Sequence, residues 1–349
     1  MGRVRSFLPL FAVMAFASVV VLCMPLRAHA QDDDPLNKIH VQPPPPAAPP
    51  PGTPSSQPPP VEGPAGLTAR PDERFRVNVN LVLIPLTVTD PMDRLVTGLE
   101  KGNFFIYEDN HLETIKSFST EDAPVSIGVI FDMSGSMADK ILRARDSILE
   151  FMKTSNPQDE FFVIGFNDRP ELMEDFTSST EQIEERLANV HAGHRTALLD
   201  AIYYGLDKMR QAKYSRKALL VVSDGGDNRS RYTEGEVRAV VRESGVQIYS
   251  IGIFDPEAPT TEERLGPILL NDISDETGGR LFKVDDVSEM GDIAAKISAE
   301  LRNEYVLGYT PTNEKHDGKW RKVKVKLVPP PGLPPLTVHS RNGYYAPLQ

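Results

Sequence analysis

Five short, continuously apolar segments in the middle of the chain constrain its fold more than any other feature. They cover residues 125–131, 159–166, 217–223, 247–254 and 280–284. Between them, apolar residues recur at helical spacing, as in Leu198, Ile202, Leu206 and Met209. A strand that is apolar on both faces must be covered on both sides. The alternation therefore predicts an α/β domain, with a mainly parallel central sheet between two layers of helices.

Segments with β character flank this central region. Before it, strand patterns occupy residues 75–84, 86–89, 104–110 and 114–118, with a turn at Asp90–Asp93. After it, similar patterns occupy residues 305–309, 321–327 and 336–341. We expect the two flanks, 73–121 and 304–349, to pair into one small β-sandwich, with the α/β domain of residues 122–303 inserted between them.

The N-terminus has the layout of a secretory signal peptide. Arg3 and Arg5 precede an apolar stretch from Phe7 to Leu26, and Ala28-His29-Ala30 supplies small residues for cleavage after Ala30. An uncleaved anchor is the alternative, because about 20 apolar residues can span a bilayer. The only cysteine, Cys23, lies in this stretch, so no intramolecular disulfide can form. We expect residues 1–30 to export the protein to the periplasm, the cell envelope or the medium, without membrane insertion after cleavage.

Residues 31–72 are rich in proline. Twelve of the chain's 31 prolines lie between Pro43 and Pro64. Such a segment favours extended polyproline II structure, which cannot pack a core. It is predicted to be a disordered, semi-rigid linker, and a proline-motif ligand for a partner is the alternative.

The charge balance excludes some partners. The formal net charge is −11, and no dense run of basic residues occurs. Binding to nucleic acid or to an anionic membrane surface needs clustered lysines and arginines, so neither is expected. No Walker A string and no glycine-rich dinucleotide motif is present either, so nucleotide binding has no support.

Oxygen-bearing side chains follow two of the apolar segments and begin one helix. Asp132, Ser134 and Ser136 come directly after the first segment, Asp224 ends the third, and Thr196 precedes an amphipathic helix. In an open α/β sheet, ligands bind beyond the carboxyl ends of the strands, so these five residues are expected to meet there. Two carboxylates and three hydroxyls suit Mg²⁺, Mn²⁺ or Ca²⁺ rather than zinc. Neutral hydroxyls leave the cation's charge partly unsatisfied, so a carboxylate from a partner can complete the site.

The pattern Asp132-x-Ser134-x-Ser136, with Thr196 and Asp224, resembles the metal-ion-dependent adhesion site (MIDAS) of von Willebrand factor A (VWFA) domains. The resemblance covers about residues 122–303 and implies a Rossmann-like, doubly wound fold. It also implies that the two serines and Thr196 contact the metal directly, while the two aspartates act largely through water. His194 and Arg195 depart from the family pattern, because many members have glycine there. These bulkier, cationic residues beside the site would favour acidic partners or hinder access to the metal.

The flanks are similar to those of acidobacterial VWFA-related proteins. The similarity rests on Glu108-Asp109-Asn110, on Pro124-Val125-Ser126, on Tyr305-x-Leu307-Gly308-Tyr309 and on Arg341-x-Gly343-Tyr344-Tyr345. It implies a shared architecture and names no ligand.

Each motif residue also has a structural interpretation. Asp132, Ser134 or Thr196 could cap a helix, and the segment from Asp224 to Asp227 could be only a turn. Asp227 and Asp200 are interpreted as solvated or capping acids rather than ligands.

An enzyme is the least favoured class. A hydrolase triad would need Ser134 or Ser136 with His191 or His194 and Asp224, but no nucleophile-elbow motif is present. We therefore expect no catalytic residues and no enzyme activity. The leading hypothesis is an exported, metal-dependent protein-binding module for adhesion or envelope assembly. The alternative is a structural envelope protein in which the metal only stabilises the site loops.

Overall fold

The computed structural model describes residues 81–120, 122–254 and 261–348. The chain divides into two units, Met1–Glu73 and Arg74–Gln349, and every described residue belongs to the second. The expected signal peptide (1–30), the expected linker (31–72) and the first part of the strand expected at 75–84 lie outside the described residues.

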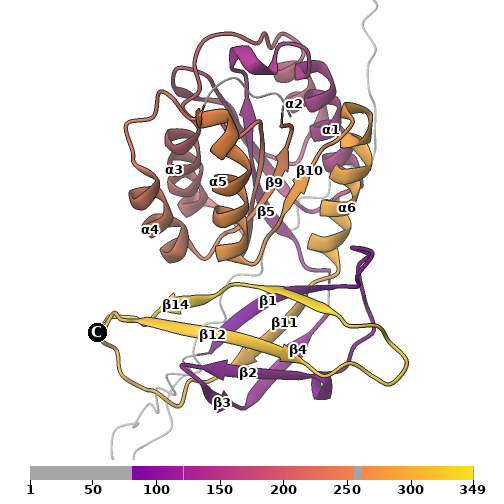
Figure 1. Cartoon of the computed structure of the whole chain (residues 1–349), viewed down its shortest axis with the longest axis vertical. Helices are drawn as coiled ribbons and strands as arrows, with labels where there is room; N and C mark the ends of the chain where they lie inside the picture. Colours follow the sequence, from indigo (N-terminus) through magenta and orange to yellow (C-terminus); the bar gives the residue numbers. More distant parts are fainter. Residues whose placement is uncertain (1–80, 121, 255–260, 349) are drawn as a thin grey trace, which may run out of the picture. The chain divides into compact units, whose positions relative to one another are not determined.

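The two flanking segments pair with each other, as predicted, and form two four-stranded antiparallel sheets (Figure 1). In one sheet the strand order is β13 (Thr337–Ser340), β1 (Val82–Thr89), β11 (Tyr305–Tyr309) and β4 (Ile115–Ser119). In the other it is β14 (Gly343–Tyr345), β12 (Trp320–Leu327), β2 (Phe104–Glu108) and β3 (His111–Glu113). Each sheet contains strands from both flanks. Together they enclose one apolar core that includes Ile84, Leu86, Ile106, Leu307 and Val325.

The central region forms a six-stranded sheet with the order β10, β9, β8, β5, β6, β7. Five strands run parallel: β5 (Val125–Asp132), β6 (Glu160–Phe166), β8 (Arg216–Ser223), β9 (Gln247–Gly252) and β10 (Leu281–Lys283). The sixth, β7 (Pro170–Thr177), pairs antiparallel with β6 at one edge. Every residue of β5 and of β9 is buried, which explains their continuously apolar sequence.

Helices cover both faces of this sheet (Figure 1). One face packs against α1 (Ile141–Thr154), α2 (Thr180–Leu187) and α6 (Met290–Arg302). The other packs against α3 (Leu198–Lys208), α4 (Glu234–Ser244) and α5 (Thr261–Thr277). Four single-turn 3-10 helices complete the described elements: Lys101–Asn103, Gly135–Met137, Met209–Gln211 and Val287–Glu289.

Local sequence sets the ends of several elements. Thr233 and Glu236 form a reciprocal capping box at the start of α4, and Gly245, with a φ of 64°, ends that helix in the left-handed conformation. Asp109 and Asn110 have φ values of 46° and 69°, so they form the tight turn between β2 and β3.

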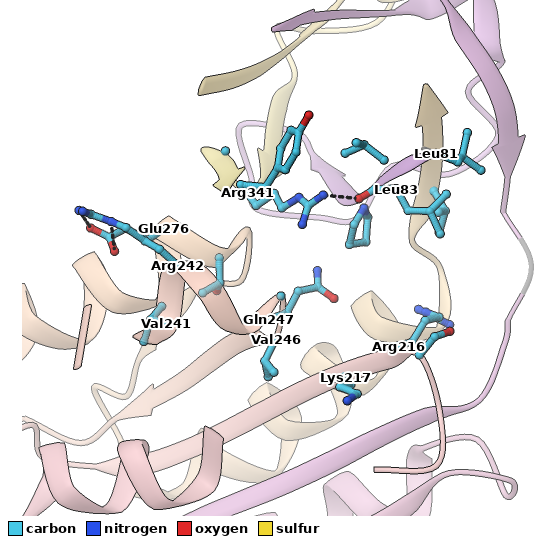
Figure 2. Close-up of a pocket in the computed structure, with 18 of the residues that line it drawn as sticks. Leu81, Leu83, Arg216, Lys217, Val241, Arg242, Val246, Gln247, Glu276 and Arg341 are labelled. Atoms are coloured by element: carbon cyan, nitrogen blue, oxygen red, sulfur yellow. Dashed lines mark hydrogen bonds and ion pairs between the residues drawn. The ribbon is translucent and has the colours of Figure 1, made fainter. Parts of the chain in front are cut away.

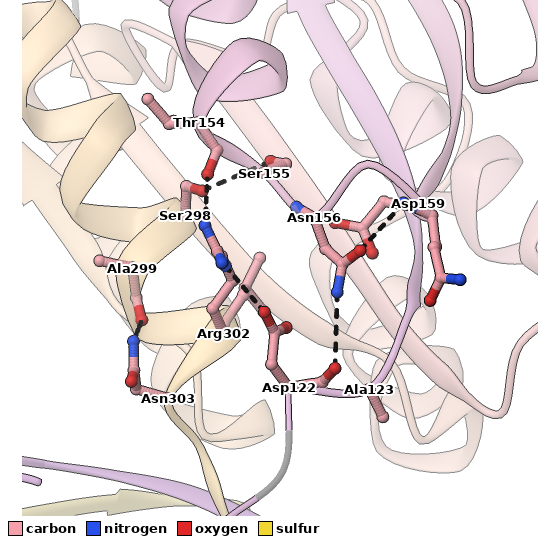
Figure 3. Close-up of polar contacts among 12 residues, drawn as sticks. Asp122, Ala123, Thr154, Ser155, Asn156, Asp159, Ser298, Ala299, Arg302 and Asn303 are labelled. Carbon is pink, nitrogen blue, oxygen red and sulfur yellow. Dashed lines mark hydrogen bonds and ion pairs between the residues drawn. The ribbon is translucent and has the colours of Figure 1, made fainter.

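The chain enters the α/β domain after β4 and leaves it before β11, and polar contacts hold the two crossings together (Figure 3). Arg302 donates to the Asp122 carboxylate over 2.9 Å, and Asn156 donates to the Asp122 carbonyl over 3.4 Å. The buried Glu304 accepts hydrogen bonds from Arg216 and Gln247, both over 2.6 Å. The inserted domain is thus fastened to the crossings near the amino ends of β8 and β9.

In the described part of the chain, no helix combines the length and the apolar character needed to cross a membrane.

Candidate metal site at the carboxyl ends of the strands

The two predicted aspartates follow neighbouring strands. Strands β5 and β8 pair in parallel, with Phe131 opposite Val222, so Asp132 and Ser223 end the two strands side by side. Asp224 follows at once. The side chains of Asp132 and Asp224 are 0% and 5% exposed, so the structure places two carboxylates in a buried position at this edge of the sheet.

Short hydrogen bonds fix the Asp132 carboxylate. One oxygen accepts from the backbone N–H of Ser134 over 2.8 Å, and the other accepts from the Ser223 hydroxyl over 2.5 Å. Burial, reinforced by the negative charge of Asp224, nevertheless raises the pKa of Asp132 to about 7. No cationic side chain in the described residues forms an ion pair with either aspartate. The site is therefore short of positive charge.

The hydroxyls of Ser134 and Ser136 lie 3.0 Å apart. Ser134 precedes the Gly135–Met137 turn, but its side chain does not cap that turn, and α1 starts only after Lys140. The alternative that Ser134 is a helix cap therefore does not hold. Both hydroxyls are free to offer lone pairs to a cation, because a hydroxyl that shares one hydrogen with its neighbour still has acceptor capacity.

Thr196 lies in a loop that hydrogen bonds connect to the Asp132 segment. Gly193 donates to the Met133 carbonyl over 2.9 Å, and Gly135 donates to the His194 carbonyl over 3.1 Å. Thr196 is 5% exposed, and α3 begins after Ala197 without a side-chain cap, so Thr196 is not the cap of that helix either.

The loop after Asp224 joins the same cluster. Asn228 accepts from the Thr196 N–H over 3.1 Å through its side-chain oxygen, and its own N–H donates to the Thr196 carbonyl over 3.0 Å. Gly225 makes the turn with a φ of 79°. The structure thus brings together the three segments that carry the five predicted residues.

The neighbouring acids have structural roles, in line with their sequence interpretation. Asp227 accepts from the N–H of Leu199 over 2.8 Å, in the first turn of α3. Asp200 accepts from the backbone N–H groups of Arg231 and Tyr232, over 2.8 and 3.1 Å. Their carboxylates hold the loops in place around the site.

The two histidines considered for a hydrolase triad, His191 and His194, have other partners. His191 contacts the Asn189 carbonyl over 2.8 Å, and His194 lies 3.5 Å from the carboxylate of Asp168. His194 also adopts a φ of 73°, a left-handed conformation that explains why glycine suits this position. Within the described ranges, no three or more His, Cys, Asp or Glu side chains gather as a metal cluster. The candidate site differs from such clusters because three of its five side chains carry hydroxyls and only two are acids.

Sequence reasoning missed two contributors, Ser223 and Asn228. Ser223 positions Asp132, and Asn228 positions Thr196. The sequence did offer a signal for Ser223, because this polar residue ends an apolar strand and directly precedes Asp224. The role of Asn228 depends on a contact between residues 32 positions apart, so no local pattern predicts it.

Residues 126–296 match the family model of the von Willebrand factor type A domain. The protein contains a von Willebrand factor A domain. This match and the observed sheet confirm the predicted fold class.

The chain is distantly similar to proteins of known sequence and of known structure. An uncharacterized protein of Borreliella burgdorferi is 23% identical over 188 residues, which cover 47% of this chain and 55% of that protein. The match therefore spans about half of the relative's length. The solved structure of BatB, a conserved hypothetical protein from Bacteroides thetaiotaomicron, is 20% identical and covers 50% of this chain and 98% of its own, with a TM-score of 0.41. A von Willebrand factor type A structure from Catenulispora acidiphila is 13% identical and covers 79% of this chain and 76% of its own, with a TM-score of 0.46.

A cavity of about 480 Å³ lies at the opposite end of the von Willebrand factor A sheet (Figure 2). Its lining includes Arg216 and Gln247, the first residues of β8 and β9, so it is remote from the carboxyl-end site. Its charged side chains serve internal contacts: Arg242 pairs with Glu276 over 2.9 Å, and Arg341 donates to the Leu83 carbonyl over 2.8 Å. The cavity belongs to the junction with the flanking sheets.

Proposed function

We propose that the protein binds a partner protein through a divalent cation, Mg²⁺ or alternatively Mn²⁺ or Ca²⁺. The cation would be held by Ser134, Ser136 and Thr196 directly and by Asp132 and Asp224 through water, as in a metal-ion-dependent adhesion site. The observation that carries the proposal is the pair of buried carboxylates, Asp132 and Asp224, that has no cationic partner in the described residues. Burying uncompensated negative charge is costly, and a hard cation relieves that cost.

The donor set also supports a role in binding. Three neutral hydroxyls balance none of the cation's charge, so a carboxylate from outside is an attractive additional ligand. We accordingly propose that the partner offers an acidic side chain, that the protein is a binding module without enzyme activity, and that it acts outside the cytoplasm. A structural role, in which the cation only stabilises the loops, is the alternative. EDTA would abolish partner binding in the first case and would only lower the melting temperature in the second.

The first test compares metal binding by the wild type and by Asp224→Ala, both in the chain that starts at Gln31. We expect the wild type to be stabilised by about 2.7 kcal/mol at a hundredfold excess of Mg²⁺ over its Kd, because a ligand that binds only the folded state stabilises it. Asp224→Ala should lose this stabilisation, since it removes a carboxylate that balances the cation. Calorimetric titration and thermal unfolding with Mg²⁺, Mn²⁺ and Ca²⁺ measure both effects.

Asp207→Ala is the matched control, because Asp207 is an exposed acid near the carboxyl end of α3, whereas Thr196 lies before the amino end of that helix. It removes the same charge, so it should change stability by less than about 0.5 kcal/mol and keep the metal-dependent stabilisation. If the wild type and Asp224→Ala bind all three ions equally, or if neither binds any of them at millimolar concentration, the metal site does not exist.

A further inference from the structure

We propose that the partner carries further acidic residues beside the one that binds the cation, and that Arg169, Arg195 and Arg229 bind them. This inference rests on the proposed function, because it takes the metal site as the centre of the contact surface.

Three loops converge on Thr196, and each carries one of these arginines. The Asn167 carbonyl accepts from the N–H of Ala197 over 2.8 Å, which ties the loop of Arg169 to the start of α3. Arg195 directly precedes Thr196. The N–H of Arg229 donates to the Thr196 carbonyl over 3.1 Å. Backbone hydrogen bonds thus hold the segments that carry the three arginines around Thr196, one of the two buried hydroxyl residues of the candidate site.

All three arginine side chains are exposed. In the described ranges, none of them forms an ion pair, whereas Arg238, Arg280 and Arg302 elsewhere in the domain all do. Asp168, which directly precedes Arg169 in the sequence, already has other partners. It accepts a hydrogen bond from the backbone N–H of Arg195 and lies 3.5 Å from His194. In a chain with a net charge of −11, three unpaired arginines at one place form a positive rim on an acidic protein.

The rim selects the class of partner. An arginine without an internal partner can form a bidentate hydrogen bond with the carboxylate of a partner. Complementary charges of this kind give binding its specificity and increase the rate of association. One carboxylate of the partner would bind the cation at the centre of the contact. Acidic residues next to it in the partner could then bind the surrounding arginines. An acidic protein segment therefore fits better than an isolated acidic residue on an apolar surface.

The test uses two synthetic peptides of equal length and otherwise Gly/Ser sequence. One has a single central Glu, and the other has additional Glu residues on both sides. Binding of each is measured in Mg²⁺ and in EDTA, at about 20 mM and about 500 mM salt, because exposed charges are screened at high salt. We expect the acidic peptide to bind more tightly, only with Mg²⁺, and with a preference that shrinks at high salt.

The triple variant Arg169→Gln/Arg195→Gln/Arg229→Gln should lose this preference, with roughly tenfold weaker binding of the acidic peptide. Its binding of the single-Glu peptide should change little. The matched control is Lys322→Gln/Lys324→Gln/Lys326→Gln, which removes the same charge from exposed positions on β12 in the flanking sheets. It should bind both peptides as the wild type does.

The outcomes separate the two proposals. If neither peptide binds in Mg²⁺, the proposed function fails and this inference fails with it. If both bind equally in Mg²⁺, or if the arginine variant keeps the preference, the metal site stands and the inference is wrong. If a single-stranded DNA oligonucleotide binds as well as the acidic peptide, with or without Mg²⁺, the rim is a general polyanion surface and the inference is also wrong.

Discussion

At the residue scale, the α/β domain contains two buried carboxyl groups with similar pKa values and different surroundings. Burial raises the pKa of both Asp132 and Glu300 to about 7. Asp132 faces a second carboxylate, Asp224, which raises its pKa further. Glu300 lies 3.2 Å from Arg280, whose charge acts in the opposite direction. Only the first arrangement lacks a cation, and this separates a candidate ligand site from an internal ion pair.

Glu300 should make the stability of the protein depend on pH. Its pKa is about 7 in the folded chain and near 4.5 when unfolded, so the folded state binds the proton more tightly. The stability that it contributes is fully present below pH 4.5 and is lost as the pH rises through 7. The loss between those limits is on the order of 3 kcal/mol. Glu300→Gln should remove this loss and make the curve less steep, while Asp132, whose pKa burial also raises to about 7, keeps its own contribution.

Denaturant unfolding between pH 5 and pH 8 measures the effect of Glu300→Gln. The exposed Glu150, on α1, provides the control: Glu150→Gln should keep the pH dependence of the wild type. Equal slopes for the wild type and Glu300→Gln would show that another group carries the dependence.

At the element scale, the sequence predicted the strands whose two faces are both apolar. Strands β5, β6, β8 and β9 were placed within one or two residues of their observed ends, because their burial leaves no polar positions to confuse the pattern. Strand β7 was missed. It begins at Pro170, contains three acids and lies half-exposed at an edge, so only its pairing with β6 makes it a strand. The three-residue strands β3 and β14 were missed because they are too short for a pattern.

For the candidate site too, the sequence predicted the part that depends on buried strands and missed the part that depends on contacts between loops. Strand ends placed Asp132 and Asp224 together, since neighbouring parallel strands end at the same edge. The backbone contacts that position Thr196 were beyond prediction, because they join three loops that are far apart in the sequence.

The packing of α5 against the Asp224 loop gives a second test of the site. A Cβ added at Gly266 would lie 2.7 Å from the Asp224 carbonyl and 2.8 Å from the Gly225 carbonyl carbon. Both are backbone atoms that cannot turn aside, so Gly266→Ala must displace the loop. We expect a loss of about 1–3 kcal/mol of stability and weaker Mg²⁺ binding, although no proposed ligand is altered.

Gly291→Ala, in α6, is the control for the helical preference of alanine. A Cβ at Gly291 meets nothing within 4 Å, so this change should be neutral or should stabilise the protein by up to about 1 kcal/mol, with unchanged Mg²⁺ affinity. Chemical denaturation and calorimetric titration of both variants measure the two effects. Unchanged Mg²⁺ affinity in Gly266→Ala would mean that the position of the Asp224 loop does not govern the site.

At the scale of the whole molecule, the first prediction concerns export. The basic start, the apolar stretch and Ala28-His29-Ala30 predict cleavage after Ala30. N-terminal sequencing of the exported protein should therefore begin at Gln31. A product that still starts at Met1 would favour the uncleaved anchor.

The two flanks are interleaved, so neither makes a complete sheet alone. Strand β1 pairs with β11 and β13, and β4 pairs with β11, so one sheet has no strand pair without the C-terminal flank. In the other sheet, β2 would keep only β3. The insertion of the α/β domain between the flanks therefore makes both crossings part of one folded unit.

Ending the chain after Asn303 should make the protein aggregate. The deletion removes β11 to β14, exposes the buried Ile84, Leu86 and Ile106, and leaves the N-terminal strands with unpaired edges that can join other copies. It also removes Glu304 and so leaves the charge of Arg216, at 17% side-chain exposure, without its acid partner. A chain that ends after Tyr345 keeps every strand and should stay soluble. Size-exclusion chromatography and thermal unfolding of the two truncated chains decide the matter: a soluble fragment ending at Asn303 that melts at the wild-type temperature would show that the flanks do not stabilise each other.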